Sequence, residues 1–175
     1  METESEKISK LLLYTHTEHK DKYSDQYMNH YLEQYRIYVN VFNSTSDRRQ
    51  KTNEFFLGIN TAIIGIIGYL TTKDVANVSL IFVFIPIVGM AICFCWYRLI
   101  LSFSQLNRAK FKVIHALEQR LPANLFDTEW VLLGGGKDST KYYPISHIER
   151  FIPIIFIVLY VVLFLVNFPM LKFFN

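Results

Sequence analysis

Cysteine is scarce in this chain, and a removable leader is missing. The only two cysteines, Cys93 and Cys95, lie two residues apart in one apolar stretch, so on a helix they point in different directions. The first ten residues, METESEKISK, are acidic and polar, and no small-residue cleavage site follows them. We therefore expect no disulfide, no metal shared by the cysteines and no cleaved signal peptide.

Motifs for phosphate or metal binding are incomplete. GGGKDST, at 134–140, resembles a phosphate-binding loop, but Val131 stands where the motif needs glycine and Asp138 where it needs serine or threonine. His16, Glu18 and His19 have no third, distant ligand beside them and are expected to be exposed polar residues. We expect no cofactor, no metal and no direct nucleic-acid binding.

Long apolar stretches are abundant instead. The chain is 51% hydrophobic and 16% aromatic in 175 residues, and its mean hydropathy is +0.21. Residues 55–71, 78–101 and 151–168 approach the length of about 20 residues that a helix needs to cross a bilayer. The sequence predicts an all-α, three-span membrane protein, with a helical arm at 1–53, spans 1 and 2 at 54–101, a stalk helix and loop at 102–149, and span 3 at 150–175.

The basic residues predict an orientation. Residues 1–54 carry eight of the eighteen lysines and arginines, and residues 98–150 carry another eight. Because such residues favour the cytoplasmic side, both segments are expected in the cytoplasm of a bacterial inner membrane. Arg48, Arg49 and Lys51 would then lie among the headgroups, where they favour anionic lipids.

Aromatic residues recur every three or four positions in the arm. This spacing predicts one stripe along a helix that ends near NSTSD, at 43–47, with Ser44 and Asp47 capping a new helix into span 1. The stripe needs a partner surface, either another helix or a docked soluble protein. Its members are Tyr23, Tyr27, Tyr31, Tyr35, Tyr38 and Phe42.

Span 1 carries small and polar residues. Gly58, Ala62, Gly65 and Gly68 form a face that lets another helix approach closely. Asn60 and Thr61 lie in the same span, and a buried asparagine in hydrocarbon marks either an interhelical hydrogen bond or a water path. Span 1 is therefore our candidate for a water-facing helix.

Span 2 is expected to leave the bilayer at Trp96, Tyr97 and Arg98 and to continue as a stalk closed by Pro122. On that stalk, Arg108 and His115 form an R-x6-H pattern, a loose signature of HEPN-type ribonucleases. Seven residues place the two about 10 Å apart along one helix face. The pattern indicates either a catalytic pair or a basic solvated face.

Two carboxylates flank apolar segments near the membrane, where an unpaired charge is costly. Glu129 and Glu149 are expected to pair with Lys110 or with an arginine nearby. Pro153 is expected in the first turn of span 3, where proline is tolerated.

Residues 96–160 carry a more specific pattern: W-Y-R, L-N-x-A-K-F-x-V-I, L-E-x-x-L-P, E-W, Y-x-P and I-E-x-x-I-P-x-x-F. This run resembles the RipA-like family of small octameric bacterial membrane proteins. The resemblance implies a homo-octamer and marks Trp96, Arg98, Lys110, Glu118, Glu129, Trp130, Tyr143, Glu149 and Pro153 as motif residues.

The tyrosine-rich arm, the size and the R-x6-H pattern also resemble the accessory membrane proteins encoded beside RNA-targeting effectors of type VI-B CRISPR systems. That resemblance implies a non-enzymatic pore that strengthens antiviral defence by membrane depolarisation or leakage, with the effector as a partner. Three helices of one protomer do not enclose water, so any pore is shared between protomers. The alternatives are a membrane-anchored ribonuclease and a membrane scaffold that recruits a soluble partner.

Overall fold

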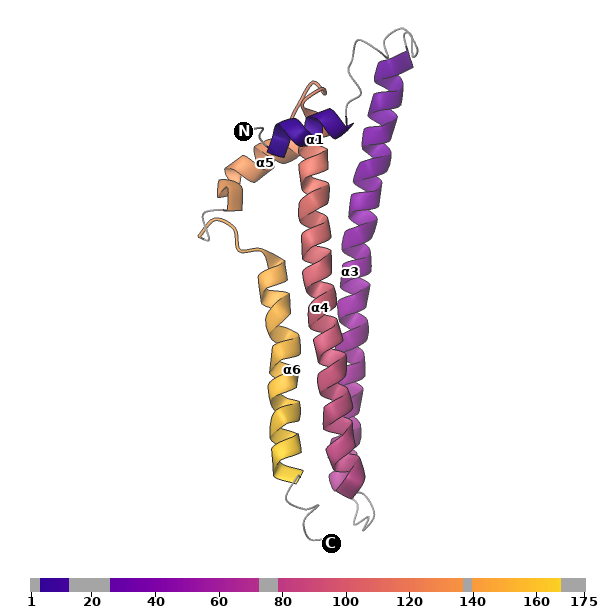
Figure 1. Ribbon diagram of the computed structural model, residues 1–175, viewed down its shortest axis with the longest axis vertical. Helices are drawn as coiled ribbons and strands as arrows, with labels where there is room; N and C mark the ends of the chain where they lie inside the picture. Colours follow the sequence, from indigo (N-terminus) through magenta and orange to yellow (C-terminus); the bar gives the residue numbers. More distant parts are fainter. Residues whose placement is uncertain (1–3, 13–25, 73–78, 137–139, 168–175) are drawn as a thin grey trace. The chain divides into compact units, whose positions relative to one another are not determined.

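The computed structural model describes residues 4–12, 26–72, 79–136 and 140–167. The regular structure in these ranges is helical, without a strand, which confirms the all-α prediction. The elements are α1 (Glu4–Leu12), α3 (Tyr27–Thr71), α4 (Ser79–Glu118), α5 (Leu125–Leu132), the short 3-10 turn η2 (Gly134–Gly136) and α6 (Ile145–Asn167), all seen in Figure 1.

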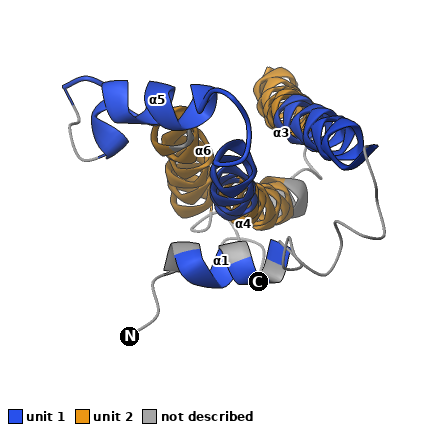
Figure 2. Ribbon diagram, turned by 90° about the horizontal axis from the view of Figure 1, so that it is seen from above, with its two compact units in different colours: residues 1–47, 104–144 blue, residues 48–103, 145–175 orange. Residues whose placement is uncertain are grey.

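The chain divides into two compact units, coloured blue and orange in Figure 2. The stalk unit consists of residues 1–47 and 104–144, and the membrane unit of residues 48–103 and 145–175. Helices α3 and α4 contribute to both units. The divisions fall at 47/48, 103/104 and 144/145, a few residues from the boundaries predicted at 53, 101 and 149.

Three of the described helices are long and apolar enough to cross a membrane, and they include residues 55–71, 79–101 and 151–167 of the three predicted spans. The apolar part of α3 ends at Thr71, where span 1 was predicted to end. Helix α4 runs without interruption to Glu118, so span 2 does continue into a stalk. The stalk helix ends four residues before Pro122, earlier than predicted.

The predicted break at 43–47 is wrong, because α3 is continuous through it. Thr45 lies inside the helix and its hydroxyl donates to the carbonyl of Val41 at 2.8 Å. A threonine can satisfy its hydroxyl in this way without ending a helix. Ser44 and Asp47 therefore do not cap a new helix.

Pro153 is also not in a first turn, because α6 begins at Ile145 and the proline is its ninth residue. Proline at this point leaves the carbonyl of Glu149 without its usual intrahelical donor. Such a gap is tolerated in membrane helices where neighbouring helices cover it, and the Pro153 side chain is fully buried.

In the membrane unit, the apolar parts of α3, α4 and α6 lie side by side (Figure 1), and residues at matching positions of the three helices are in contact. The face of α3 that carries Arg49, Asn53, Phe56 and Asn60 has the same spacing as the α6 face that carries Glu149, Pro153, Phe156 and Tyr160. Arg49 contacts Glu149, and Asn60 contacts Tyr160, so these two helices run parallel. Helix α4 runs in the opposite direction and fills the space between them with Trp96, Cys93 and Gly89.

Candidate functional site

The centre of the membrane unit is a polar network, here called the span network, made by Asn60, Cys93 and Tyr160. Asn60 is 0% exposed, and its side-chain NH2 donates to the carbonyl of Phe56 at 2.8 Å. Its Oδ1 accepts from the Cys93 thiol at 3.1 Å and from the Tyr160 hydroxyl at 3.0 Å. Of the two interpretations of Asn60, the structure therefore shows the interhelical hydrogen bond.

The span network lies near the middle of the bilayer. Arg49 and Thr71 are about 33 Å apart along α3 at 1.5 Å per residue, close to the hydrocarbon thickness of about 30 Å. Asn60 is half-way between them, about 16 Å from Arg49. At this depth no water replaces a lost partner, so the three helices are held in one register by the need to satisfy Asn60.

Trp96 packs between the helices about one to two helical turns closer to Arg49 than the span network. Its indole is 1% exposed and donates to Asn53 Oδ1 at 2.9 Å. The ring stacks on Phe56 at a centroid distance of 5.8 Å and contacts Phe156 at 6.3 Å. Trp96 was predicted at the lipid interface, but it packs between the helices because its N–H finds a protein acceptor there.

Gly89 allows Tyr160 to reach the span network. A Cβ atom at Gly89 would lie 2.5 Å from the ring carbon Cζ of Tyr160. The bare backbone of α4 thus forms one wall of the ring's site, and the Tyr160 side chain is fully buried. Gly89 therefore permits close packing of the ring against α4.

The small-residue face of α3 points away from these contacts. By the 100° rotation per residue, Gly58, Ala62 and Gly65 lie about 140–200° around the helix from Asn60. No atom lies within 4 Å of a Cβ built on Gly58, Gly65 or Gly68, so no described helix of the same protomer packs there. Thr61 is exposed beside this face, and its hydroxyl donates to the carbonyl of Leu57 at 2.8 Å.

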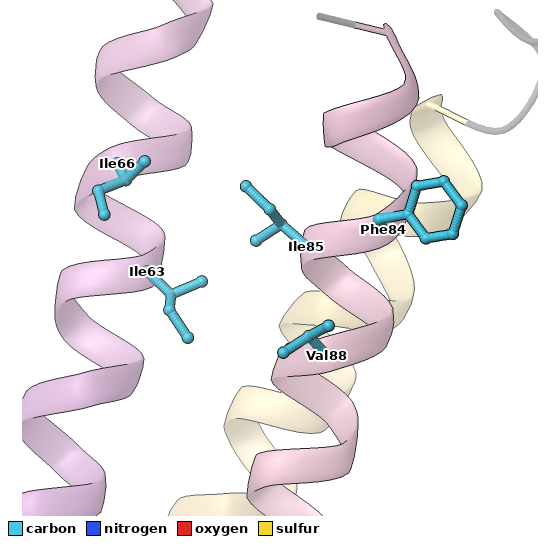
Figure 3. A pocket seen from close by; sticks show the side chains of 5 residues that line it. All are labelled: Ile63, Ile66, Phe84, Ile85 and Val88. Carbon is cyan, nitrogen blue, oxygen red and sulfur yellow. The ribbon is translucent and has the colours of Figure 1, made fainter.

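An apolar groove of about 220 Å³ lies between α3 and α4 in the membrane unit. Figure 3 shows Ile63 and Ile85 pointing toward one another, while Phe84 points away from α3. Ile66 and Val88 complete the lining, and no polar residue contributes to it. A groove of this chemistry suits hydrocarbon and offers nothing to an ion.

The stalk unit contains a second polar network, here called the stalk network, around Glu118. This carboxylate is 0% exposed and accepts from the backbone N–H groups of Phe126, at 3.1 Å to each oxygen, and of Asp127, at 3.2 Å. The Tyr35 hydroxyl donates to Glu118 Oε1 at 3.0 Å. Glu118 thus binds the amino terminus of α5, where free N–H groups and the helix dipole favour an anion.

Aromatic residues of α3 surround the stalk network. The Tyr31 hydroxyl donates to the carbonyl of Leu117 at 2.5 Å, Arg120 donates to the Tyr27 hydroxyl at 3.2 Å, and Phe42 packs against Phe111. Burial, followed by the bond to Glu118, raises the pKa of Tyr35 to about 12. The stripe therefore packs on its own chain; Tyr23 lies outside the described residues.

Arg108 and His115 do not converge. Arg108 is exposed, whereas His115 turns toward α5, with Nδ1 3.5 Å from Asp127 Oδ1 and its ring against Phe111. His115 Nε2 is buried and has no hydrogen-bond partner. Both ring nitrogens of His115 are thus accounted for by the stalk unit, Nδ1 by its contact with Asp127 and Nε2 by burial.

The other motif residues have mostly structural contacts. Lys110 donates to Thr45 Oγ1 and, at 3.2 Å, to the carbonyl of Val41, so it is not the partner of either glutamate. Arg49 is the arginine near Glu149, at 3.8 Å, whereas Glu129 is exposed. Trp130 stacks on Phe111 and meets Tyr142 edge-on, while Arg98 and Tyr143 are exposed.

Metal ligands do not cluster in the described ranges, where no group of three histidines, cysteines or carboxylates could hold an ion. His16, Glu18 and His19 lie outside the described residues, as do Lys137 and Asp138 of the glycine-rich loop. Asp127 and Tyr35 were missed as site residues from sequence; an acidic residue in the first turn of a helix was the available signal for Asp127.

Three spans joined at the bilayer centre by hydrogen bonds, with a helical stalk unit, define a multi-span α-helical membrane protein. The model of the octameric membrane protein family (8xMP) matches residues 32–169, most of the chain, and the protein belongs to this family. It is accordingly a homo-oligomeric membrane protein. Neither a curated protein nor a solved structure matches the chain.

Proposed function

We propose that the chain is one protomer of an oligomeric membrane pore that acts in antiviral defence by depolarising the membrane or making it leak. The family is octameric, which supplies the neighbours that a pore needs. Within one protomer, Asn60 Oδ1 accepts hydrogen bonds from both other spans, and its NH2 donates to the carbonyl of Phe56 in its own helix. A water path therefore has to run between protomers rather than through one.

The outward face of α3 carries this proposal. It presents Gly58, Thr61, Ala62 and Gly65, small residues with open space around them. The outward faces of α4 and α6 present large apolar side chains instead, which suit lipid: Ile87, Phe94, Ile155, Val158, Val162 and Leu165. Span 1 thus remains our candidate for the water-facing helix. Thr61 alone, and not Asn60, is the polar side chain that faces the water path.

The sequence supports the proposed orientation and partner. Sixteen of eighteen lysines and arginines lie in residues 1–54 and 98–150, which supports a cytoplasmic stalk unit in a bacterial inner membrane. Resemblance to the type VI-B accessory proteins supports an RNA-guided effector as the source of the activating signal. A docking role for the aromatic stripe has no support, since Tyr31, Tyr35 and Phe42 already contact their own chain.

Cysteine accessibility tests the pore. In a Cys95→Ser background, which removes the one exposed thiol of the described chain, Thr61→Cys is introduced into protein reconstituted in dye-loaded vesicles. We expect leakage, and we expect a charged, membrane-impermeant thiol reagent to reduce it several-fold, because the modified side chain obstructs water.

The matched control is Val158→Cys, on the outward face of α6. There the reagent should have no effect, because lipid covers the thiol. An oligomer that does not leak when activated, or equal block of both variants, would contradict the proposal.

We also propose that the protein is not an enzyme and that Arg108 and His115 act in folding. Purified protein should leave single-stranded RNA intact over hours, and His115→Ala should leave vesicle leakage per folded oligomer unchanged. RNA cleavage that is lost in both Arg108→Ala and His115→Ala would establish the ribonuclease instead.

A further inference from the structure

Unpartnered polar atoms gather where α3 and α6 enter the apolar part of the membrane unit. Arg49 Nε, Glu149 Oε2 and Arg150 Nε are buried and have no hydrogen-bond partner, and in the described residues only Asn107 and His115 show the same. Buried polar atoms are nearly always satisfied, by protein, water or a ligand. Arg49 and Glu149 are in contact, and Arg150 adjoins Glu149 in sequence, so the three atoms indicate that something is bound here in the assembled protein.

The charges at this point favour an anion. Arg49 Nε lies 3.8 Å from Glu149 Oε1, too far for a hydrogen bond, and the two side chains are only 20% and 16% exposed. Arg150 follows Glu149 in α6 and adds a second guanidinium. Two guanidiniums against one carboxylate leave a net positive charge, with donors in the planar geometry that matches phosphate oxygens.

The depth of the cluster identifies the source of the phosphate. Arg49 lies about 33 Å along α3 from Thr71, so the two ends of this stretch reach the two headgroup regions. Deeper in the membrane unit, the indole N–H of Trp96 bonds Asn53, and below it the contacts are apolar or belong to the span network. The phosphates of lipid headgroups therefore lie at the level of Arg49.

We propose that Arg49 and Arg150 bind the phosphodiester of a phospholipid headgroup, and that Glu149 accepts a hydrogen bond from a hydroxyl or ammonium group on the same headgroup. The three side chains are partly exposed, so the phosphodiester oxygens accept from guanidinium N–H groups of the two arginines while the headgroup donates to the Glu149 carboxylate. Such a lipid ties the entry of span 1 to that of span 3. A headgroup without a donor, as in phosphatidylcholine, leaves Glu149 Oε2 unsatisfied.

Native mass spectrometry of the whole oligomer tests this site, after extraction from bilayers of equal parts phosphatidylglycerol and phosphatidylcholine. We expect phosphatidylglycerol to be retained about tenfold over phosphatidylcholine, since one charge-assisted hydrogen bond is enough for that ratio. Arg49→Gln and Arg150→Gln should each abolish the preference. Arg49→Lys, which keeps the charge but not the planar fork, should lower it.

Arg48→Gln is the matched control, because Arg48 is exposed and the substitution removes the same charge one residue away. Equal loss in Arg48→Gln would show that general attraction, and no built site, selects the lipid. Equal retention of both lipids by the native protein would overturn the proposal. Displacement of the lipid by millimolar glycerol phosphate would also overturn it, in favour of a site for free phosphate. Arg49→Lys keeps the test valid if Arg49→Gln does not assemble.

Discussion

Gly89→Ala is expected to destabilise the membrane unit by about 3 kcal/mol. The new methyl group would lie 2.5–2.7 Å from three ring carbons of Tyr160, and the ring is fully buried, so it cannot move without leaving Asn60. Overpacking costs about 1–3 kcal/mol, and the lost hydrogen bond about 1 more. The thermal midpoint in detergent measures the change, followed by the fluorescence of Trp96 in a Trp130→Phe background.

The cause can be separated from a general effect of alanine in a helix. Gly58→Ala, made in open space on α3, should be neutral or stabilising by about 1 kcal/mol. In a Tyr160→Leu background the cost of Gly89→Ala should fall by more than half, because the ring that the methyl group meets is gone. The same cost in both backgrounds would show that the contact with Tyr160 is not responsible.

Apolar length and periodicity predicted the helices well, because hydrocarbon allows few alternatives to an internally bonded helix. The three spans and the continuous α4 follow from this constraint alone. The break in α3 was predicted wrongly, since NSTSD is polar enough to begin a helix but Thr45 satisfies its hydroxyl within one. Local sequence alone does not show whether a serine or threonine hydroxyl begins a new helix or bonds a carbonyl within a continuous one.

The polar contacts were only half predictable. The cost of burying an unbonded asparagine predicted that Asn60 needs a hydrogen-bond partner. Its interhelical partners lie far away in sequence, and Tyr160 is separated from it by 100 residues. Helical periodicity predicts which face of a helix is buried, but it does not predict the register between two helices. The same gap explains Lys110, which was expected to pair with a glutamate and instead bonds Thr45 and the carbonyl of Val41.

The span network and the stalk network each fix the register between helices, the first in hydrocarbon and the second outside it. In the membrane unit, Asn60 makes helix register costly to change because hydrocarbon offers no substitute partner. In the stalk unit, Glu118 does so with a charge, and Tyr35 from α3 completes its coordination.

Glu118→Ala is the second large change we expect, a loss of roughly 3–5 kcal/mol confined to the stalk unit. The substitution leaves the Tyr35 hydroxyl and the N–H groups of Phe126 and Asp127 without their acceptor, at about 1–3 kcal/mol each. Nothing local replaces it, because Asn124 at the start of α5 makes no side-chain cap. Hydrogen exchange of peptides covering 119–133 should accelerate at least tenfold, while peptides covering 85–100 keep their protection.

Glu129→Ala removes an exposed carboxylate of α5, the helix that Glu118 binds, and should change stability by less than about 0.5 kcal/mol. Glu118→Gln separates charge from shape. Its NH2 group would face N–H and O–H donors, so the single amide oxygen has to accept all of their hydrogen bonds. We therefore expect most of the loss of stability seen with alanine. If Glu118→Gln instead exchanges like the native protein, the carboxylate is not what binds α5. Helix α5 would then be held by its side-chain contacts, namely Phe126 with Phe42 and Phe111, Trp130 with Phe111, and Asp127 with His115.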